Sequence, residues 1–237
     1  MSSLDAYELK FLVDTALARQ VEAWGRDHLA IDPHADPALG GAYRVRSIYC
    51  DTPELDVYFR NDGYRRRKFR LRRYGVESVV HLERKSKPGD RVRKRRTAVA
   101  GHELSRLGKD VDPAWPGFWF QRRLSARRLQ PRCLITYERH AHVGMGGDGP
   151  MRMTLDHDIR AALAGGFDFE PAARDTLLLP GAVVLELKFQ SRLPALFRAL
   201  MHDMKLTPSG VSKYRMGIEA CGLAADSAPV PRVHKAG

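Results

Sequence analysis

The stretch Lys68-Phe69-Arg70-Leu71-Arg72 places a cation at every second position and a bulky apolar residue between each pair of cations. Residues two apart in a β-strand share a face, so this stretch has one cationic face and one apolar face. Three other stretches repeat the layout, with a carboxylate and a lysine two residues apart on the polar side. These pairs are Glu8 and Lys10, Glu83 and Lys85, and Glu186 and Lys188. The pattern predicts a sheet of amphipathic strands with highly charged polar faces.

The basic charge of the chain is concentrated around this stretch. The net charge is +12, and residues 60–96 hold 16 Lys and Arg against 4 Asp and Glu, whereas the remainder holds 24 of each kind. An excess confined to one segment indicates a site for an anion and not a generally basic surface. An ordinary solvated sheet face is the alternative, but such faces usually mix charges of both signs. Clustered cations repel each other by roughly 4 kcal/mol at 4 Å and an effective dielectric of about 20, and a bound polyanion would relieve that repulsion.

Composition excludes several classes of protein. The 237 residues are 43% hydrophobic, which suits one large folded domain and excludes a disordered chain. The sequence has no run of about 18 apolar residues and no secretory signal at its start. Cys50, Cys133 and Cys221 are scattered and odd in number, which favours thiols in a reducing compartment. We therefore expect a cytoplasmic protein.

Alternation, turn residues and caps predict the order of the elements. We expect a domain over residues 1–223 and a flexible tail over residues 224–237. Strands are expected over about 7–13, 43–50, 65–74, 78–86, 91–99, 132–143, 152–157, 183–189 and 214–221. Helices are expected from about Asp14 to Leu29, Pro53 to Arg60, His102 to Arg128 with a break near Pro113, and Pro194 to Met204. Short turns between strands predict an α+β fold that is mainly antiparallel β, with the sheet closed or nearly closed and helices packed outside it.

If the sheet closes, the charged faces line its interior. Glu8, Glu83 and Glu186 are then sparse carboxylates in a basic cavity, which makes them candidate ligands of Mg²⁺ or Mn²⁺ that bridge phosphates. The glycine-rich run of residues 144–149 lacks the Lys-Ser/Thr of a phosphate loop and is interpreted as a hairpin tip. His140, His142 and His157, with Asp156 and Asp158, are expected to alternate across two strands and not to form a metal cluster, although Asp156 and Asp158 remain open as secondary metal ligands.

Eight spaced motifs over residues 5–222 resemble the VTC (vacuolar transporter chaperone) domain of the triphosphate tunnel metalloenzymes. In chain order they are Glu8-x-Lys10, Ser47-Ile48-Tyr49-x-Asp51-Thr52, Arg70-x-Arg72-x-Tyr74-Gly75, Glu83-Arg84-Lys85, Lys94-x-Arg96, Tyr137-x-Arg139, Glu186-x-Lys188 and Ser212-Lys213-Tyr214. Each motif is weak alone, but the ordered set is fairly specific. The resemblance implies an eight-stranded closed tunnel barrel in which the γ-phosphate of ATP or another nucleoside triphosphate is transferred to polyphosphate with Mn²⁺ or Mg²⁺.

The resemblance also implies roles for individual residues. Glu186 is the principal expected metal ligand. The expected catalytic residues are Lys10, Arg70, Arg72, Arg139 and Glu186. The expected phosphate-binding residues are Lys10, Arg60, Arg70, Arg72, Lys85, Lys94, Arg96, Arg139, Lys188 and Lys213. The run from Arg93 to Arg96 leaves the register of Lys94 open by one residue, which would reverse its face.

The chain departs from the hydrolase branch of the superfamily, which opens with Glu-x-Glu-x-Lys, because Ala6 stands at the first carboxylate position. This favours a polymerase, with a tripolyphosphatase and a non-catalytic polyphosphate- or RNA-binding module as the alternatives. No specific nucleic-acid partner is expected, because few aromatic residues share the cationic face and Phe69 points away from it. The sequence contains no membrane segment, so a partner protein would have to supply any coupling to membrane transport.

Overall fold

The computed structural model describes residues 7–86, 93–110, 112–147 and 149–224. Its strands are β1 (Tyr7–Asp14), β2 (Ala30–Ile31), β3 (Ala42–Asp51), β4 (Arg67–Tyr74), β5 (Val79–Ser86), β6 (Arg93–Ala100), β7 (Gln130–Gly146), β8 (Gly149–Leu163), β9 (Thr176–Leu177) and β10 (Ala182–Phe189). The α-helices are α1 (Thr15–His28), α2 (Asp56–Phe59), α3 (Phe118–Ala126), α4 (Ala195–Asp203) and α5 (Lys213–Ala220). Two 3-10 helices cover Pro37–Leu39 and Gly101–Arg106. The expected tail lies almost wholly outside the described residues.

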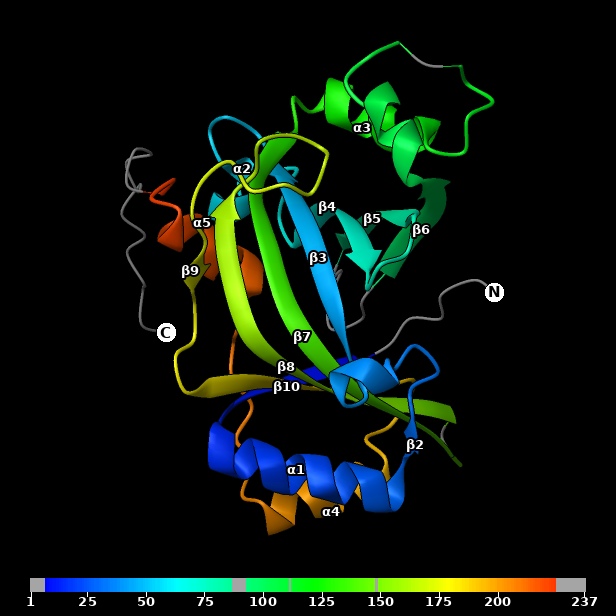
Figure 1. The fold of residues 1–237 in the computed structure, drawn as a ribbon, viewed down its shortest axis with the longest axis vertical. Helices are drawn as coiled ribbons and strands as arrows, with labels where there is room; N and C mark the ends of the chain where they lie inside the picture. Colours follow the sequence, from blue (N-terminus) through cyan, green and yellow to red (C-terminus); the bar gives the residue numbers. More distant parts are fainter. Residues whose placement is uncertain (1–6, 87–92, 111, 148, 225–237) are drawn as a thin grey trace.

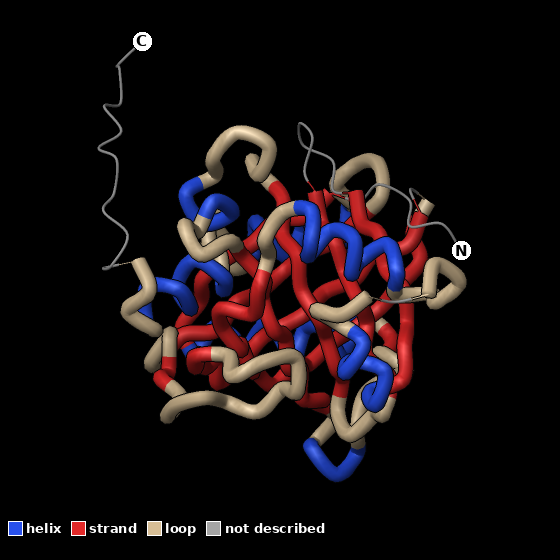
Figure 2. The backbone as a smooth tube through the Cα atoms, turned by 90° about the horizontal axis from the view of Figure 1, so that it is seen from above, coloured by secondary structure: helices blue, strands red, loops and turns tan. Residues whose placement is uncertain are grey.

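The strands form one antiparallel sheet in the order β1-β10-β8-β7-β3-β4-β5-β6, with β2 on β7 and β9 on β8. The mainly antiparallel α+β fold is therefore confirmed, and the long strands β3, β7 and β8 run side by side in Figure 1. Figure 2 shows the strands crossing in the middle of the molecule, with most of the helices around them. The expected closed barrel is not formed by backbone pairing among the described residues, because β1 and β6 end the sheet without pairing to each other. Side chains nevertheless meet between β1 and β5, the neighbour of β6, where Lys85 Nζ lies 2.6 Å from Glu8 Oε2.

The outer face of the sheet has a separate apolar core at the end of the molecule that carries α1 and α4 (Figure 1). Asp14 begins α1 as the expected cap, since its side chain accepts a hydrogen bond from the backbone N–H of Leu17. Val21 of α1 and Phe197 of α4 are fully buried against this face, together with Leu155 of β8. The outward apolar side chains of the strands are thus covered by helices at this end, as their alternation requires.

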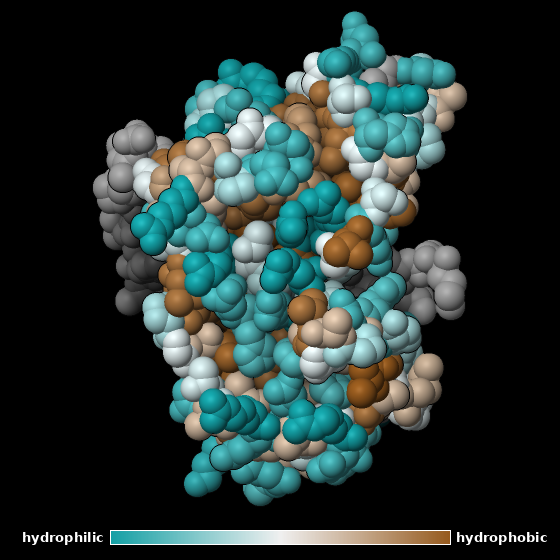
Figure 3. Space-filling model, in the orientation of Figure 1, coloured by the Kyte–Doolittle hydropathy of each residue, from teal (hydrophilic) through white to brown (hydrophobic). Residues whose placement is uncertain are grey.

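The outer face of β3, β7 and β8 also carries charged side chains that meet water. Here the two signs are mixed and paired, with Arg44 3.3 Å from Glu138 and Arg160 3.1 Å from Asp175. Figure 3 shows hydrophilic side chains over most of the face that these strands present, with hydrophobic patches between them. This is the ordinary mixed surface that the alternative interpretation predicts, and it lies on the opposite face from the single-sign ladder of β4.

The expectation of a strand over residues 214–221 was wrong, because these residues form helix α5. The apolar residues Tyr214, Gly217 and Ile218 recur at helical spacing and are buried, and the Ser212 side chain caps the helix by accepting from the Arg215 N–H. A Cβ atom on Gly217 would clash with the Ile135 side chain of β7, so glycine allows α5 to approach the sheet closely. Helix α5 therefore covers the inner face of the sheet at the end away from α1.

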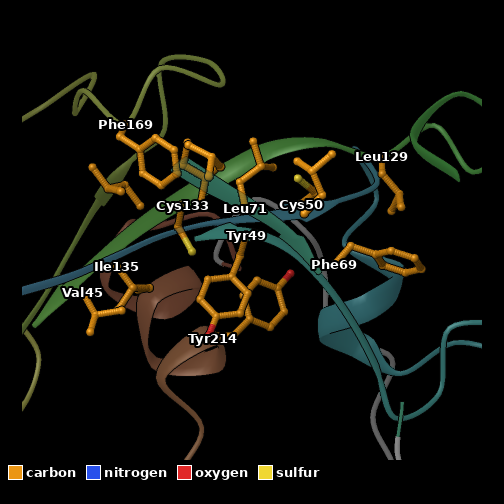
Figure 4. Packing of buried hydrophobic residues seen from close by; sticks show 14 of the residues in the cluster. Val45, Tyr49, Cys50, Phe69, Leu71, Leu129, Cys133, Ile135, Phe169 and Tyr214 are labelled. Atoms are coloured by element: carbon orange, nitrogen blue, oxygen red, sulfur yellow. The ribbon is translucent and has the colours of Figure 1, made fainter. Parts of the chain in front are cut away.

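Tyr214 of α5 points toward Tyr49 of β3 in Figure 4, and their ring centroids lie 5.2 Å apart. The Tyr214 hydroxyl donates to the buried carboxylate of Asp51. Asp51 also accepts from the backbone N–H groups of Thr52, Val57 and Tyr58 at the start of α2. Burial raises the pKa of Asp51, although these hydrogen bonds act in the opposite direction. One carboxylate thus joins α5, β3 and α2.

We expect Asp51→Ala to lower the free energy of unfolding by about 3 kcal/mol, because it leaves buried donors without an acceptor. Tyr214→Phe should cost about 1 kcal/mol, since Asp51 keeps its backbone donors. Urea denaturation followed by circular dichroism measures both changes. Tyr7→Phe is the matched control, because the Tyr7 hydroxyl bonds to no described residue. Equal stabilities for all four proteins would contradict the anchoring role of Asp51.

Candidate active site

A polar cavity lies on the inner face of the sheet, between α5 and the seam where β5 approaches β1. Its narrow centre has a volume of about 50 Å³ and is lined by side chains from β1, β3, β4, β5, β7, β10 and α5. The lining residues are Glu8, Lys10, Tyr49, Lys68, Arg70, Arg72, Lys85, Tyr137, Arg139, Glu186, Lys188 and Lys213. The charged faces of five strands therefore converge on one interior space, together with Tyr49 of β3 and Lys213 of α5, as the alternation of the sequence predicts.

Wider spaces of about 430 and 440 Å³ share lining residues with the narrow centre. The first lies beside α2 and α5 and is lined in part by Arg60, Arg67 and Lys68. The second is lined in part by Lys94 and Arg96. Glu8 and Lys85 line all three spaces, so the spaces adjoin one another, and we refer to them together as the cation-lined passage.

Alternating charges link the strands across the constriction. Lys85 contacts Glu8 at 2.6 Å, and Lys10 lies 3.3 Å from Glu8 and 3.1 Å from Glu186. Lys213 lies 3.5 Å from Glu186 and 2.6 Å from Asp156. We call this sequence, which continues from Asp156 to Arg139, the ion chain. It joins β5, β1, β10, α5, β8 and β7 through their side chains.

Arg139 and Asp156 form the most buried pair of the ion chain. Nε and Nη2 of Arg139 donate to the two carboxylate oxygens of Asp156 at 2.6 and 2.7 Å, and Asp156 is fully buried. Burial would raise the pKa of Asp156, but Arg139 and Lys213 lower it below its ordinary value. A fork-shaped, charge-assisted pair of this kind fixes the guanidinium plane of Arg139.

Glu186 is the carboxylate with the most cationic surroundings. Its two oxygens lie 3.1 Å from Lys10, 3.0 Å from Lys188 and 3.5 Å from Lys213. Burial would raise its pKa, but these cations hold the pKa well below its ordinary range. The pKa of Glu8 is lowered as well, mainly by Lys188, Lys10 and Lys85, against the opposing effects of burial and of the Glu186 charge. Both side chains are therefore carboxylates in the folded protein.

Glu83 lies in a different group of cations. It is fully buried and contacts Arg70 at 2.6 Å, Lys94 at 2.6 Å and Arg96 at 2.7 Å. It shares none of these partners with Glu8 or Glu186, so the structure does not join the three predicted metal ligands into one group. The register of β6 is settled as well. In the β5–β6 ladder Lys94 lies opposite Lys85 and Arg96 lies opposite Glu83, so Lys94 and Arg96 both face inward.

Lys68 and Arg72 form no ion pair with a carboxylate of the described residues. The Lys68 ammonium donates to Ser212 Oγ at 3.0 Å, and Arg72 Nε donates to Ser47 Oγ at 3.0 Å. Burial, and then the charges of Lys10 and Lys85, hold the pKa of Lys68 well below its ordinary value. These two side chains are the cavity cations that a bound anion would neutralise first.

The structure thus brings together nearly all of the predicted site residues. Arg60 is exposed at the outer edge of one wide space and is the most peripheral of them. Alternation within β4 marks Lys68 as an inward cation, but no motif assigned it a role. Asp156, which sequence reasoning left open as a metal ligand, is instead the buried partner of Arg139 and Lys213. Asp158 lies away from the cavity and pairs with Arg160, and Ala6 lies outside the described residues.

The histidines are arranged differently from the expectation. His140 and His157 share the outer face of the sheet, where donor atoms of His140, His157 and Glu22 lie within 4.8 Å of one another. His140 Nδ1 is 2.5 Å from the Glu22 carboxylate, which already provides it with a partner. This group lies behind the cavity wall, whereas His142 packs near α1 with its Nδ1 unpaired.

The architecture is shared with solved structures of low sequence identity. A putative adenylate cyclase from Bacillus halodurans matches with a TM-score of 0.56 at 12% identity, covering 90% of this chain and 96% of that one. A putative adenylyl cyclase from Hippeastrum, described as having a dominant triphosphatase activity, matches with a TM-score of 0.52 at 11% identity, covering 92% and 97%. At these identities the likeness establishes a common fold and no more.

The family model of the VTC domain matches residues 5–221, and the chain belongs to this family. This confirms the family that the eight motifs indicated. No curated protein matches the chain. Among the described residues, no helix is long and apolar enough to cross a bilayer.

Tyr74 provides a spectroscopic test of the cavity charge. Burial would raise its pKa, but Arg72 and Arg96 lower it to about 7. Its ordinary pKa is about 10, so its ionisation adds stability as the pH rises from about 7 to about 10. We expect a tyrosinate absorbance with a midpoint near pH 7 that Tyr74→Phe removes. Tripolyphosphate bound beside Arg72 and Arg96 should raise this midpoint, and an unchanged midpoint at saturating tripolyphosphate would place the anion elsewhere.

Proposed function

We propose that the protein is a metal-dependent polyphosphate polymerase that transfers the γ-phosphate of ATP to a polyphosphate chain. The observation that carries the proposal is the passage, in which a narrow cationic centre adjoins two wider spaces. A linear polyanion suits such a path, because successive phosphates can meet successive cations. Membership of the VTC domain family supports the same substrate class. Three free cysteines support a reducing compartment, for which we propose the cytoplasm.

We also propose that the sheet of eight strands, from β1 to β6 in spatial order, closes into a tunnel. The Lys85–Glu8 pair supports this closure, because it connects the border strand β1 with β5, the neighbour of the other border strand β6, where no backbone ladder does. Side chains alone would then complete the wall along this line. Such a wall can loosen locally without breaking a strand pair.

The inward cations of the central cavity bind the triphosphate. Arg70, Arg72 and Arg139 offer guanidinium forks that suit phosphate oxygens, whereas Lys10 provides a point charge. Lys68 adds a cation that pairs with no described carboxylate. The remaining cations continue the path on either side: Arg60, Lys85, Lys94, Arg96, Lys188 and Lys213.

Glu8 and Glu186 fit a divalent cation of the Mg²⁺ or Mn²⁺ class. Both carboxylates face the same cavity, both lie beside Lys10, and each is ionised. Mg²⁺ is usually held by one or two carboxylates together with substrate phosphates, which matches this sparse oxygen donor set. The bound ion would neutralise charge on the phosphates. Glu83 contacts Arg70, Lys94 and Arg96 and shares no cation with Glu8 or Glu186. Its role as a metal ligand therefore stays a prediction.

Phosphoryl transfer requires positioning and charge neutralisation more than covalent help. A terminal oxygen of the acceptor chain attacks the γ-phosphorus, the bond from that phosphorus to the bridging oxygen breaks, and ADP leaves with the electron pair. The attacking oxygen is already ionised, so no side chain has to act as a base. The arginines hold the transferring group between donor and acceptor and offset its charge.

Lys10→Ala and Glu186→Gln test the assignment. We expect each to reduce the rate of chain growth about 100-fold or more, because each removes a charge that faces the transferring phosphates. The rate is measured with ATP, Mn²⁺ and a short polyphosphate primer. Arg19→Ala on the exposed face of α1 serves as the control. Turnover close to that of the parent in both site variants would defeat the assignment.

The same assay, with a parallel sample that contains tripolyphosphate as the substrate, separates the three functions. Lengthening of polyphosphate, seen by staining in a gel, supports the polymerase. Release of orthophosphate from tripolyphosphate without chain growth supports a hydrolase, the activity named for the Hippeastrum neighbour. Binding of polyphosphate without either reaction supports a non-catalytic module.

A further inference from the structure

Five arginines gather outside the cavity, on the outer face of β4, β5 and β6 and on the adjoining helix α3. We call Arg67, Arg84, Arg95, Arg123 and Arg127 the arginine strip. Arg84 and Arg95 stand directly opposite each other in the antiparallel pairing of β5 and β6. Like charges in such a cross-strand position oppose sheet formation. The fold keeps this unfavourable pair on a face that has no part in the cavity.

Among the described residues, no Asp or Glu forms an ion pair with any of the five members of the strip. Burial, and then the charges of Arg127 and Arg123, lower the pKa of Arg67. Burial, and then Arg123, Arg67, Arg95 and Arg127, lower the pKa of Arg84. The five side chains therefore act on one another as a single cluster. This differs from the outer face of β3, β7 and β8, where charges of opposite sign are paired.

Aromatic rings orient two of these arginines. The Arg95 guanidinium lies 4.3 Å from the ring centre of Trp119, and that of Arg127 lies 4.9 Å from the ring centre of Tyr64. Stacking holds a guanidinium by its face and leaves N–H groups at its edge for an anion. Beside Trp119 there is a hollow of about 230 Å³, lined also by Arg95, Arg122 and Arg123.

The strip begins at the mouth of the cavity. Arg67 lines the wide space beside α2 and α5, together with Lys68. These two residues are consecutive in β4, so the strand directs one cation to the interior and the next to the exterior. An anionic chain that leaves the cavity beside Lys68 reaches Arg67 first, and then the rest of the strip.

We infer that the arginine strip is a second polyphosphate-binding site, which holds the part of the chain that lies outside the cavity. The inference rests on the proposed function for the identity of the chain. Arg95 binds phosphate through the edge that Trp119 leaves open, Arg84 binds beside it, and Arg123 of α3 and Arg127 at the end of that helix extend the path. A single-stranded nucleic acid fits less well, because Arg95 covers one face of Trp119 and the indole N–H is bonded to Thr97 Oγ1.

The test compares long-chain polyphosphate with tripolyphosphate, which is too short to occupy cavity and strip together. In the double variant Arg84→Gln, Arg95→Gln we expect affinity for the long chain to fall about tenfold or more, since two charge-assisted contacts are lost. Its affinity for tripolyphosphate should change less than twofold. Fluorescence competition titration at one fixed salt concentration measures both. The dependence of long-chain affinity on salt should also become shallower, because fewer counterions are released.

The matched control is Arg19→Gln, Arg198→Gln, which removes the same charge from α1 and α4 at the opposite end of the molecule from α3 (Figure 1). This control should bind both ligands like the parent. Thermal unfolding checks the fold, and the strip variant should be at least as stable as the parent because Arg84 and Arg95 no longer repel. A second variant, Arg123→Gln, lies on α3 and tests the strip without altering the sheet.

Unchanged long-chain affinity in both strip variants would overturn the inference, as would an equal loss in the control. A preference of the strip for single-stranded RNA over long-chain polyphosphate would overturn it in favour of a nucleic-acid site. Failure of the proposed function is a separate result, namely absence of chain growth in the parent protein. Binding is measured without turnover, so it tests the strip in either case.

Discussion

The ion chain is the constraint on which the rest of the structure depends. Placing several ammonium and guanidinium groups inside a sheet is costly unless carboxylates lie among them. Glu8, Glu186 and Asp156 each contact at least two cations, and together they connect five strands and α5. The cost is reduced without being removed, since Lys68 and Arg72 pair with no carboxylate in the part of the chain that the structure describes. The interior remains folded and still attracts anions.

The same contacts explain why the centre of the passage is narrow. Lysines that reach across to carboxylates fill the space that phosphates would occupy, and only about 50 Å³ remains. When a polyanion enters, the lysines must exchange their carboxylate partners for phosphate oxygens. This exchange lets the lysines swing back toward their strands. Arg139 is different, because its two-point contact with Asp156 holds it in place. The site combines lysines that reach across to carboxylates with an arginine that Asp156 holds at two points.

Much of this arrangement could be predicted from the sequence, for a specific reason. Alternation in residues 68–72 settles which side chains share a face, and convergence follows once the sheet curves. Residues 214–221 were misassigned because an apolar residue every few positions suits a strand or a helix, and the Ser212 cap was not recognised. The partners of Asp156 could not be predicted, because a bulge shifts the β7–β8 register that sets Arg139 opposite it, and Lys213 comes from α5, far away in the chain. The register of β6 required the contacts of Glu83.

An open sheet has two unpaired borders, and unpaired strand borders invite the stacking of one molecule on another. The loop beside β1 shields one border, where the Ser209 N–H bonds to the carbonyl of Lys10. At the other border β6 has Arg93, Lys94, Arg95 and Arg96 in succession, and such a block of charge is a common deterrent to self-association. The cations of β6 therefore do two things at once. Neutralising them, by substitution or by a bound polyanion, would remove a safeguard of solubility as well as a contact.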